Sequence, residues 1–151
     1  MLLSLRWLAG ALFVVIVPIV GSAAEPGAAG RVKVVSGPVF VVRANVVTPA
    51  TAGQALFEAD TLRTGANGRV GITLNDDTRV SLGPDSEARL DQFVYAPAEK
   101  RGGLVLEVVR GLIAYVSGRI AKLSPDAVKL ETPNAIVGVR GTTLVLRVDA
   151  K

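Results

Sequence analysis

From Gly30 onward the sequence is a series of short β-branched runs separated by turn-forming residues, and this pattern limits the fold more than any other feature. Residues 69–74 and 79–82 alternate polar and apolar side chains, and the four residues between them read Asn-Asp-Asp-Thr. Such alternation is typical of strands with one buried face, joined here by a hairpin turn. We predict that five side chains of this hairpin face the core, namely Val70, Ile72, Leu74, Val80 and Leu82.

The rest of the chain has the same character and shows no amphipathic helix of ordinary length after the first 25 residues. Further strands are predicted on both sides of Gly37 and of Gly111, because glycine punctuates β-rich runs. Three finer expectations are a surface loop at residues 45–53, a bulge or strand end near Gln92, and one helical turn within residues 118–126. The predicted fold class is all-β.

Two pairs of segments resemble each other in sequence. Residues 34–42 align without gaps to residues 108–116, and the Leu-x-Thr opening of residues 62–71 recurs at Leu130. Because both pairs occur in the same order, they favour one supersecondary unit used twice. The unit would form a β-roll or solenoid-like stack of short antiparallel or mixed strands with glycine corners, or else a β-sandwich, and we favour the roll. The alternative is that valine and glycine recur by chance in a β-rich chain.

Composition restricts the classes of function. With 151 residues, half of them apolar, the chain is long enough for one domain with its own core. The net charge of +4 comes from basic residues scattered among acidic ones, so no nucleic-acid partner is predicted. Histidine and cysteine are absent, which removes imidazole bases, thiol nucleophiles and the usual zinc ligands. We therefore expect no enzyme activity, no cofactor and no metal.

Carboxylates are the remaining candidates for chemistry. Two groups could in principle ligate calcium or act as acid and base: Asp76 with Asp77, and Asp85 with Glu87 and Asp91. They lie in predicted turns and on the outward phase of predicted strands. We therefore favour solvated surface acids as the interpretation of both groups.

Residues 1–24 have the composition of a secretory leader, with a short basic start, an apolar middle and small residues that signal peptidase prefers. Cleavage after Ala24 would leave a spacer at residues 25–29 and a domain at residues 30–149. The mature chain is expected in the periplasm, with no membrane insertion once the leader is removed. The alternative is an uncleaved anchor, which the glycine and proline residues within the apolar run disfavour.

Several short motifs follow one another along the domain. The most specific is Thr132-Pro133-Asn134-Ala135 followed by Val139-Arg140-Gly141-Thr142, and weaker ones are Leu62-Arg63-Thr64-Gly65, Asp76-Asp77-Thr78 and Leu82-Gly83-Pro84-Asp85-Ser86. In this order they resemble the FecR family of bacterial envelope domains over residues 30–149. Ala59 and Asp77 stand where that family usually has glycine. Because Asp tolerates a left-handed turn, the hairpin at Asp77 is expected to form.

The resemblance implies a role in the cell envelope. In the founding member of the family, the domain is the periplasmic part of an inner-membrane regulator that receives a signal from an outer-membrane transporter and passes it to a sigma factor. The implied partner is therefore an envelope protein, either an outer-membrane receptor or an inner-membrane regulator. Because a leader occupies the residues before the domain, only the exported sensory or binding module is expected here. The alternatives are a purely structural envelope module without a regulated ligand and, more remotely, a small hydrolase.

Five residues of the most specific motif are candidates for contact with that partner: Thr132, Pro133, Arg140, Gly141 and Thr142. Gly138 and Gly141 have the spacing of a phosphate-binding loop, but no helix follows them, so both are interpreted as corners. A positive φ is expected at Gly141. For Arg140 two roles remain, a semi-buried pair with a carboxylate that bridges strands or a contact with the partner, and we favour the first.

Overall fold

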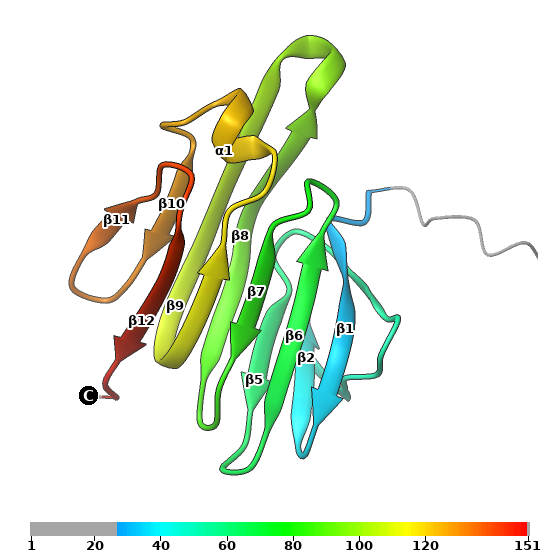
Figure 1. The fold of residues 1–151 in the computed structure, drawn as a ribbon. Helices are drawn as coiled ribbons and strands as arrows, with labels where there is room; N and C mark the ends of the chain where they lie inside the picture. The colour runs from blue at the N-terminus through cyan, green and yellow to red at the C-terminus, as the bar shows by residue number, and fades with distance from the viewer. Residues whose placement is uncertain (1–26, 151) are drawn as a thin grey trace, which may run out of the picture.

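The structure is a computed structural model that describes residues 27–150. The leader and the cleavage site expected at residues 1–24 lie outside the described residues. Within them the chain forms one curled sheet with two short helical turns, so the all-β prediction is confirmed (Figure 1). The strands are β1 (Gly30–Ser36), β2 (Val39–Arg43), β3 (Val46–Pro49), β4 (Ala55–Leu56), β5 (Thr61–Thr64), β6 (Arg69–Leu74), β7 (Arg79–Leu82), β8 (Glu87–Ala96), β9 (Arg101–Val116), β10 (Val128–Glu131), β11 (Ile136–Gly138) and β12 (Thr143–Val148), and the helical turns are η1 (Pro97–Glu99) and α1 (Ile120–Leu123). No helix of the described part is long and apolar enough to cross a membrane.

The sheet curls so that two layers face each other across the core. We call the layer nearest the viewer in Figure 1 the front layer, which contains β4, β1, β6, β7, the second half of β9 and β12. The rear layer contains β3, β2, β5, β8, the first half of β9, β10 and β11. Paired strands run antiparallel, except that β10 is parallel to β9.

Strand β9 belongs to both layers because it changes direction at Gly111. Residues 101–110 pair with β8, and residues 111–116 pair with β12. The backbone of Gly111 has a φ of +95°, which residues with a side chain rarely adopt, and a Cβ there would lie 2.1 Å from Ser86 Oγ. Glycine is therefore required where the strand passes from the rear layer to the front layer.

The core lies between the layers. The five side chains predicted to face inward from the β6–β7 hairpin are all buried, which confirms the interpretation of their alternation. The rear layer contributes Leu62, Leu90 and Leu106, and α1 contributes Ile120. Burying a side chain of this size stabilises the folded chain by about 1.5–3 kcal/mol. The core is therefore the main source of stability in a chain that contains no cysteine.

The structure tests the three finer expectations. A register shift between Leu90 and Gln92 in the β8–β9 ladder confirms the bulge, and α1 is the expected helical turn. The surface loop expected at residues 45–53 is wrong for its first half, which forms β3. All four residues of β3 are exposed, and the strand is held by main-chain pairing with β2. Because no face of β3 is buried, its sequence carries no alternation that would have predicted a strand.

The internal repeat is only partly reflected in the structure. Gly37 and Gly111 both have a positive φ, at +67° and +95°, and each lies where the chain passes from one layer to the other. The strands that follow differ, because β5 and β6 belong to opposite layers whereas β10 and β11 form a hairpin within the rear layer. The equivalence of the two units is limited to these strand–corner–strand segments, β1 with β2 and the two halves of β9.

Candidate functional site

Residues 132–142, which we call the motif segment, connect the β10–β11 edge of the rear layer to β12 in the front layer (Figure 1). The segment begins with the turn of the β10–β11 hairpin. The Thr132 hydroxyl donates to the carbonyl of Ala135 at 3.1 Å and accepts from the N–H groups of Asn134 and Ala135 at 3.4 and 3.0 Å. The Thr132 hydroxyl, one residue before Pro133, is thus used within the chain to shape the turn.

Arg140 lies on the surface rather than between strands. Its side chain is 74% exposed and forms an ion pair with Asp126, which is similarly exposed in the loop before β10. The semi-buried bridge expected from the sequence is therefore wrong. Val139 takes the buried position instead, and its N–H donates to the carbonyl of Val128 at 3.0 Å. Because neighbouring side chains in extended backbone point in opposite directions, Arg140 is directed outward.

The chain turns at Gly141 and is then tied to the end of β9. Gly141 has a φ of +58°, which confirms the expected positive φ. The N–H of Thr142 donates to Ser117 Oγ at 3.0 Å, and the Ser117 hydroxyl and N–H donate to the carbonyl of Thr142 at 3.0 and 3.1 Å. These bonds fix the point at which the motif segment joins the front layer.

The contacts divide the five candidate residues into two groups. Thr132 and Pro133 lie at the turn of the β10–β11 hairpin, whereas residues 140–142 lie at its other end, beside the end of β9. Ile136, between the two groups, is 67% exposed. Sequence reasoning did not single out Ile136, because an isoleucine in a β-rich run is normally interpreted as a core residue.

Asp76 is the centre of a buried polar cluster that the sequence did not predict. Its carboxylate accepts from the N–H and the hydroxyl of Thr78 at 3.1 and 2.7 Å and from the N–H of Ile120 at 3.2 Å. The Thr78 hydroxyl in turn accepts from the N–H of Gly118 at 3.1 Å. The interpretation of Asp76 as a solvated turn acid is therefore wrong. The residue is buried because the segment after β9 covers the hairpin turn.

The Asp76 cluster is closely packed and joins the β6–β7 turn to the end of β9. A Cβ at Gly118 would lie 2.3 Å from the backbone nitrogen of Thr78 and 2.4 Å from the carbonyl oxygen of Asp76. Burial raises the pKa of the neighbouring Tyr115 phenol above its ordinary value, and its hydroxyl has no hydrogen-bond partner among the described residues. The cluster is therefore a structural feature of the fold rather than an open site.

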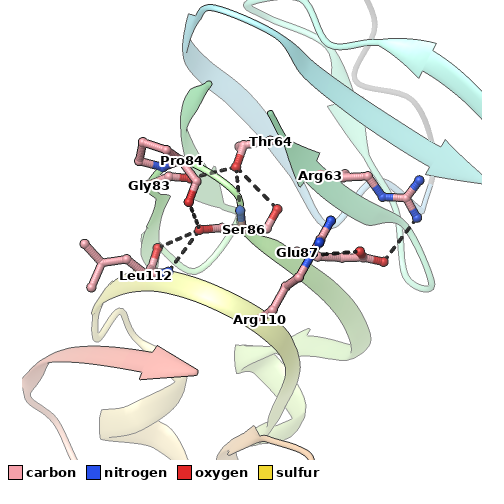
Figure 2. Close-up of polar contacts among 8 residues, drawn as sticks. All are labelled: Arg63, Thr64, Gly83, Pro84, Ser86, Glu87, Arg110 and Leu112. Carbon is pink, nitrogen blue, oxygen red and sulfur yellow. Dashed lines mark hydrogen bonds and ion pairs between the residues drawn. The ribbon is translucent and has the colours of Figure 1, made fainter. Parts of the chain in front are cut away.

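A second buried cluster surrounds Ser86, where β9 bends (Figure 2). The Thr64 hydroxyl donates to the carbonyl of Gly83 at 2.7 Å and accepts from the N–H of Ser86 at 2.9 Å. The Ser86 hydroxyl accepts from the N–H of Leu112 at 3.0 Å. The Leu-x-Thr-Gly and Gly-Pro-Asp-Ser motifs therefore hold together β5, the turn after β7, and β9.

The other carboxylates considered for chemistry are dispersed. Glu87 lies between Arg63 and Arg110, with nitrogen–oxygen distances of 3.2 and 3.7 Å (Figure 2), and Asp91 pairs with Arg89 at 3.5 Å. Across residues 27–150, no group of three or more His, Cys, Asp or Glu side chains could hold a metal ion.

Asp60 is a further buried acid, and sequence reasoning assigned it no role. Its carboxylate accepts from Nε and Nη2 of Arg43, both at 2.7 Å, and from the N–H of Phe57 at 2.8 Å. The Arg43 guanidinium also lies 4.5 Å from the centre of the Phe57 ring. The signal in the sequence was the preceding Ala59, at a position where the resemblance led us to expect glycine. Ala59 has a φ of +72°, which explains why glycine suits that position.

Part of the chain matches a known protein family. Residues 60–151, more than half of the chain, match a family model described as FecR protein. The matched range begins at Asp60 and includes both buried clusters and the motif segment. No curated protein and no solved structure matches the chain.

Proposed function

Because the chain belongs to the FecR family, we propose that it is an exported, non-enzymatic module that binds another protein of the cell envelope in signal sensing or assembly. The family takes part in signal transduction across the envelope. The proposal includes a periplasmic location and, as partner, an outer-membrane receptor or an inner-membrane regulator.

The main support for the proposal is the contrast between the buried and the exposed residues of the family motifs. Thr64, Asp76 and Thr78 are buried and hydrogen-bonded within the chain, so their role is accounted for by the fold. On the motif segment, by contrast, Arg140 and Ile136 are exposed. Arginine is enriched among the residues that dominate protein–protein binding energies. An exposed arginine in the most specific motif therefore supports a protein partner.

The strands beside the motif segment offer a second feature suited to protein binding. Counting only the strands of the described chain, β12 pairs with β9 alone and β11 with β10 alone. Each therefore has one main-chain edge that no other described strand covers. Such edges can accept a strand from a partner.

The test is capture of the partner by the full chain, expressed with its own leader and a C-terminal affinity tag. The envelope fraction is cross-linked, the captured proteins are identified by mass spectrometry, and the best candidate is purified for titration calorimetry. We expect a defined envelope protein to bind. Repeated failure to recover any envelope protein would favour the rival interpretation, a structural module without a regulated ligand.

The role of Arg140 is tested with Arg140→Ala and a matched control, Arg101→Ala. Both arginines are exposed and paired with an exposed carboxylate, Asp126 for Arg140 and Glu99 for Arg101. We expect Arg140→Ala to weaken partner binding about tenfold and to leave the free energy of unfolding within about 0.5 kcal/mol, because exposed ion pairs contribute little. Arg101→Ala should change neither quantity. Equal effects of the two variants on binding would exclude the motif segment as the contact.

A further inference from the structure

The outer face of the front layer has a shallow hollow that runs across its strands. Five strands each contribute one residue to it, and each of these residues is the direct cross-strand neighbour of the next, so that together they form one row. In order from β1 to β12, the row is Val34, Gly71, Ser81, Ala114 and Val145. The three central residues are small, so they form a floor between two valines. With strands about 4.8 Å apart, the row is roughly 19 Å long.

The hollow is apolar and open to solvent. It has a volume of about 540 Å³, and Leu112 and Gly83 lie along one side. Val34 and Val145 at its ends are each 63% exposed, and Leu112 is 36% exposed. Apolar side chains gathered at one exposed place mark binding sites more often than isolated ones do, and the volume is within the range of ligand pockets.

Arginines lie on both sides of the hollow. Arg31 and Arg79 belong to the neighbouring row on one side, and Arg69 and Arg147 to the row on the other side. Rows on one face of a sheet are about 6.6 Å apart, which is within the length of an arginine side chain. None of the four arginines forms an ion pair with any residue in the range 27–150.

The two layers differ in charge. The strand residues of the front layer include no Asp or Glu. Of the acids just beyond these strands, Asp77 pairs with Arg119, and Asp85 and Asp149 line a second hollow together with Arg147 without forming an ion pair with it. The strands of the rear layer carry acidic residues as well as basic ones. The acidic residues are Glu87, Asp91, Glu107 and Glu131. The fold thus gathers unpaired positive charge on one face, although the basic residues are scattered along the sequence.

We propose that this face binds an acidic, partly apolar polypeptide segment in extended conformation. This proposal rests on the proposed function, because the segment would belong to the envelope partner. Acidic side chains on either side of such a segment would meet Arg31 and Arg79 or Arg69 and Arg147, and apolar ones would contact Val34 and the neighbouring aliphatic residues. The face is also continuous with the motif segment, since Thr142 leads directly into β12. A polypeptide fits better than a bilayer, which is flat on this scale and would not reach a floor of small residues.

The experiment measures fluorescence anisotropy of a labelled twelve-residue peptide of Glu, Val and Ala, titrated with the full chain. We expect saturable binding that weakens as salt is raised, and no binding of the same peptide with Gln in place of Glu. Vesicles containing phosphatidylglycerol are tested in parallel. Absence of peptide binding, or vesicle binding without peptide binding, would overturn the proposal.

Two variants locate the binding. Arg69→Glu/Arg147→Glu is compared with Lys122→Glu/Lys129→Glu, which changes the net charge equally at exposed positions away from the hollow. We expect about tenfold weaker peptide binding for the first pair and an unchanged affinity for the second, because steering by net charge alone would affect both alike. Equal losses would mean that the peptide responds only to net charge and would overturn the proposal.

Ser81→Trp fills the floor without changing the charge, and we expect it to weaken peptide binding about tenfold as well. Retained affinity would show that the hollow is not occupied, and this too would contradict the proposal. Thermal melting confirms that each variant is folded, and Arg31→Glu/Arg79→Glu replaces any pair that is not.

Binding of the captured partner to the wild-type chain and to the variants distinguishes a failure of this proposal from a failure of the proposed function. If the wild-type chain and Arg69→Glu/Arg147→Glu bind the partner equally, the front face is not the site, although the proposed function stands. If no partner is captured, the proposed function fails, and the peptide titrations alone decide whether the face binds acidic polypeptides.

Discussion

At the scale of single residues, substitutions at positions with a positive φ show whether a change in the free energy of unfolding comes from backbone conformation or from side-chain packing. Gly141 has a φ of +58°, and a Cβ there would meet no atom within 4 Å. The cost of Gly141→Ala therefore comes from the backbone alone, and we expect the free energy of unfolding to fall by about 1 kcal/mol in urea titrations. Gly138→Ala is the matched control, because its Cβ also meets no atom within 4 Å and its φ is ordinary. An equal loss at both positions would contradict the explanation.

The reverse substitution, alanine to glycine at a positive φ, can be made at Ala59. Ala59 is a residue with a side chain at a φ of +72°. Ala59→Gly should relieve this strain and raise the free energy of unfolding by up to about 1 kcal/mol. Ala66→Gly, at an exposed turn residue without a positive φ, should lower stability or leave it unchanged. The idea fails if Ala59→Gly is the more destabilising of the two.

At the scale of elements, the buried clusters connect strands that are distant in sequence. The Asp76 cluster ties the β6–β7 turn to the residues after β9, and the Ser86 cluster ties β5 to the bend of β9. Both are built from short motifs of the family pattern. The motifs therefore specify how β9 is attached at its bend and at its end, which no single strand could determine.

Substitutions of two adjacent aspartates test how much the Asp76 cluster contributes to stability. Asp76→Asn replaces an acceptor with a donor opposite the N–H of Ile120, so a buried group is left unsatisfied, and we expect a loss of about 1–3 kcal/mol in the free energy of unfolding. Asp77→Asn removes only an exposed ion pair with Arg119. It should leave the melting temperature nearly unchanged, because Asn tolerates the left-handed conformation of this position. Similar melting temperatures for the two variants would show that the cluster contributes little.

Tyr115 on β9 gives the fold a dependence on alkaline pH. Burial raises the pKa of its phenol above the ordinary value of 10.0, so the folded chain holds this proton more tightly than the unfolded chain does. The resulting stability is fully present below about pH 10 and is lost as the pH rises above it. We expect Tyr115→Phe to flatten the fall in melting temperature above about pH 10. An unchanged slope in Tyr115→Phe would assign the alkaline loss of stability to other groups.

At the scale of the whole molecule, folding sorts charges that are mixed along the chain. Arg31 and Arg79 come to lie in one row across the front layer although nearly fifty residues separate them in sequence. The acids of the strands are placed in the rear layer, where Glu87 pairs with Arg63. The net charge alone therefore did not reveal the basic face.

The export of the whole chain is a prediction from the sequence of residues 1–24. We expect the protein recovered from a periplasmic extract to begin near Glu25, because small residues suited to signal peptidase end at Ala24. N-terminal sequencing measures this directly. An intact Met1 on membrane-bound protein would reject cleavage in favour of the anchor.

The sequence by itself was sufficient for the features that depend on local patterns. The inward set Val70, Ile72 and Leu74 follows from a two-residue period, the bulge at Gln92 from a slip of that period, and the left-handed φ of Gly141 from its place between strands. The family was also recognisable, because its motifs are short stretches of consecutive residues.

The tertiary structure alone decided which strands become neighbours. Asp76 is buried by residues that follow β9, Arg140 points outward because Val139 packs beside Val128, and Val145 lies in one row with Val34. These outcomes depend on pairing between segments far apart in the chain. A two-residue period predicts which face of a strand is buried. It does not predict which strand will lie beside it or which residues will cover its turn.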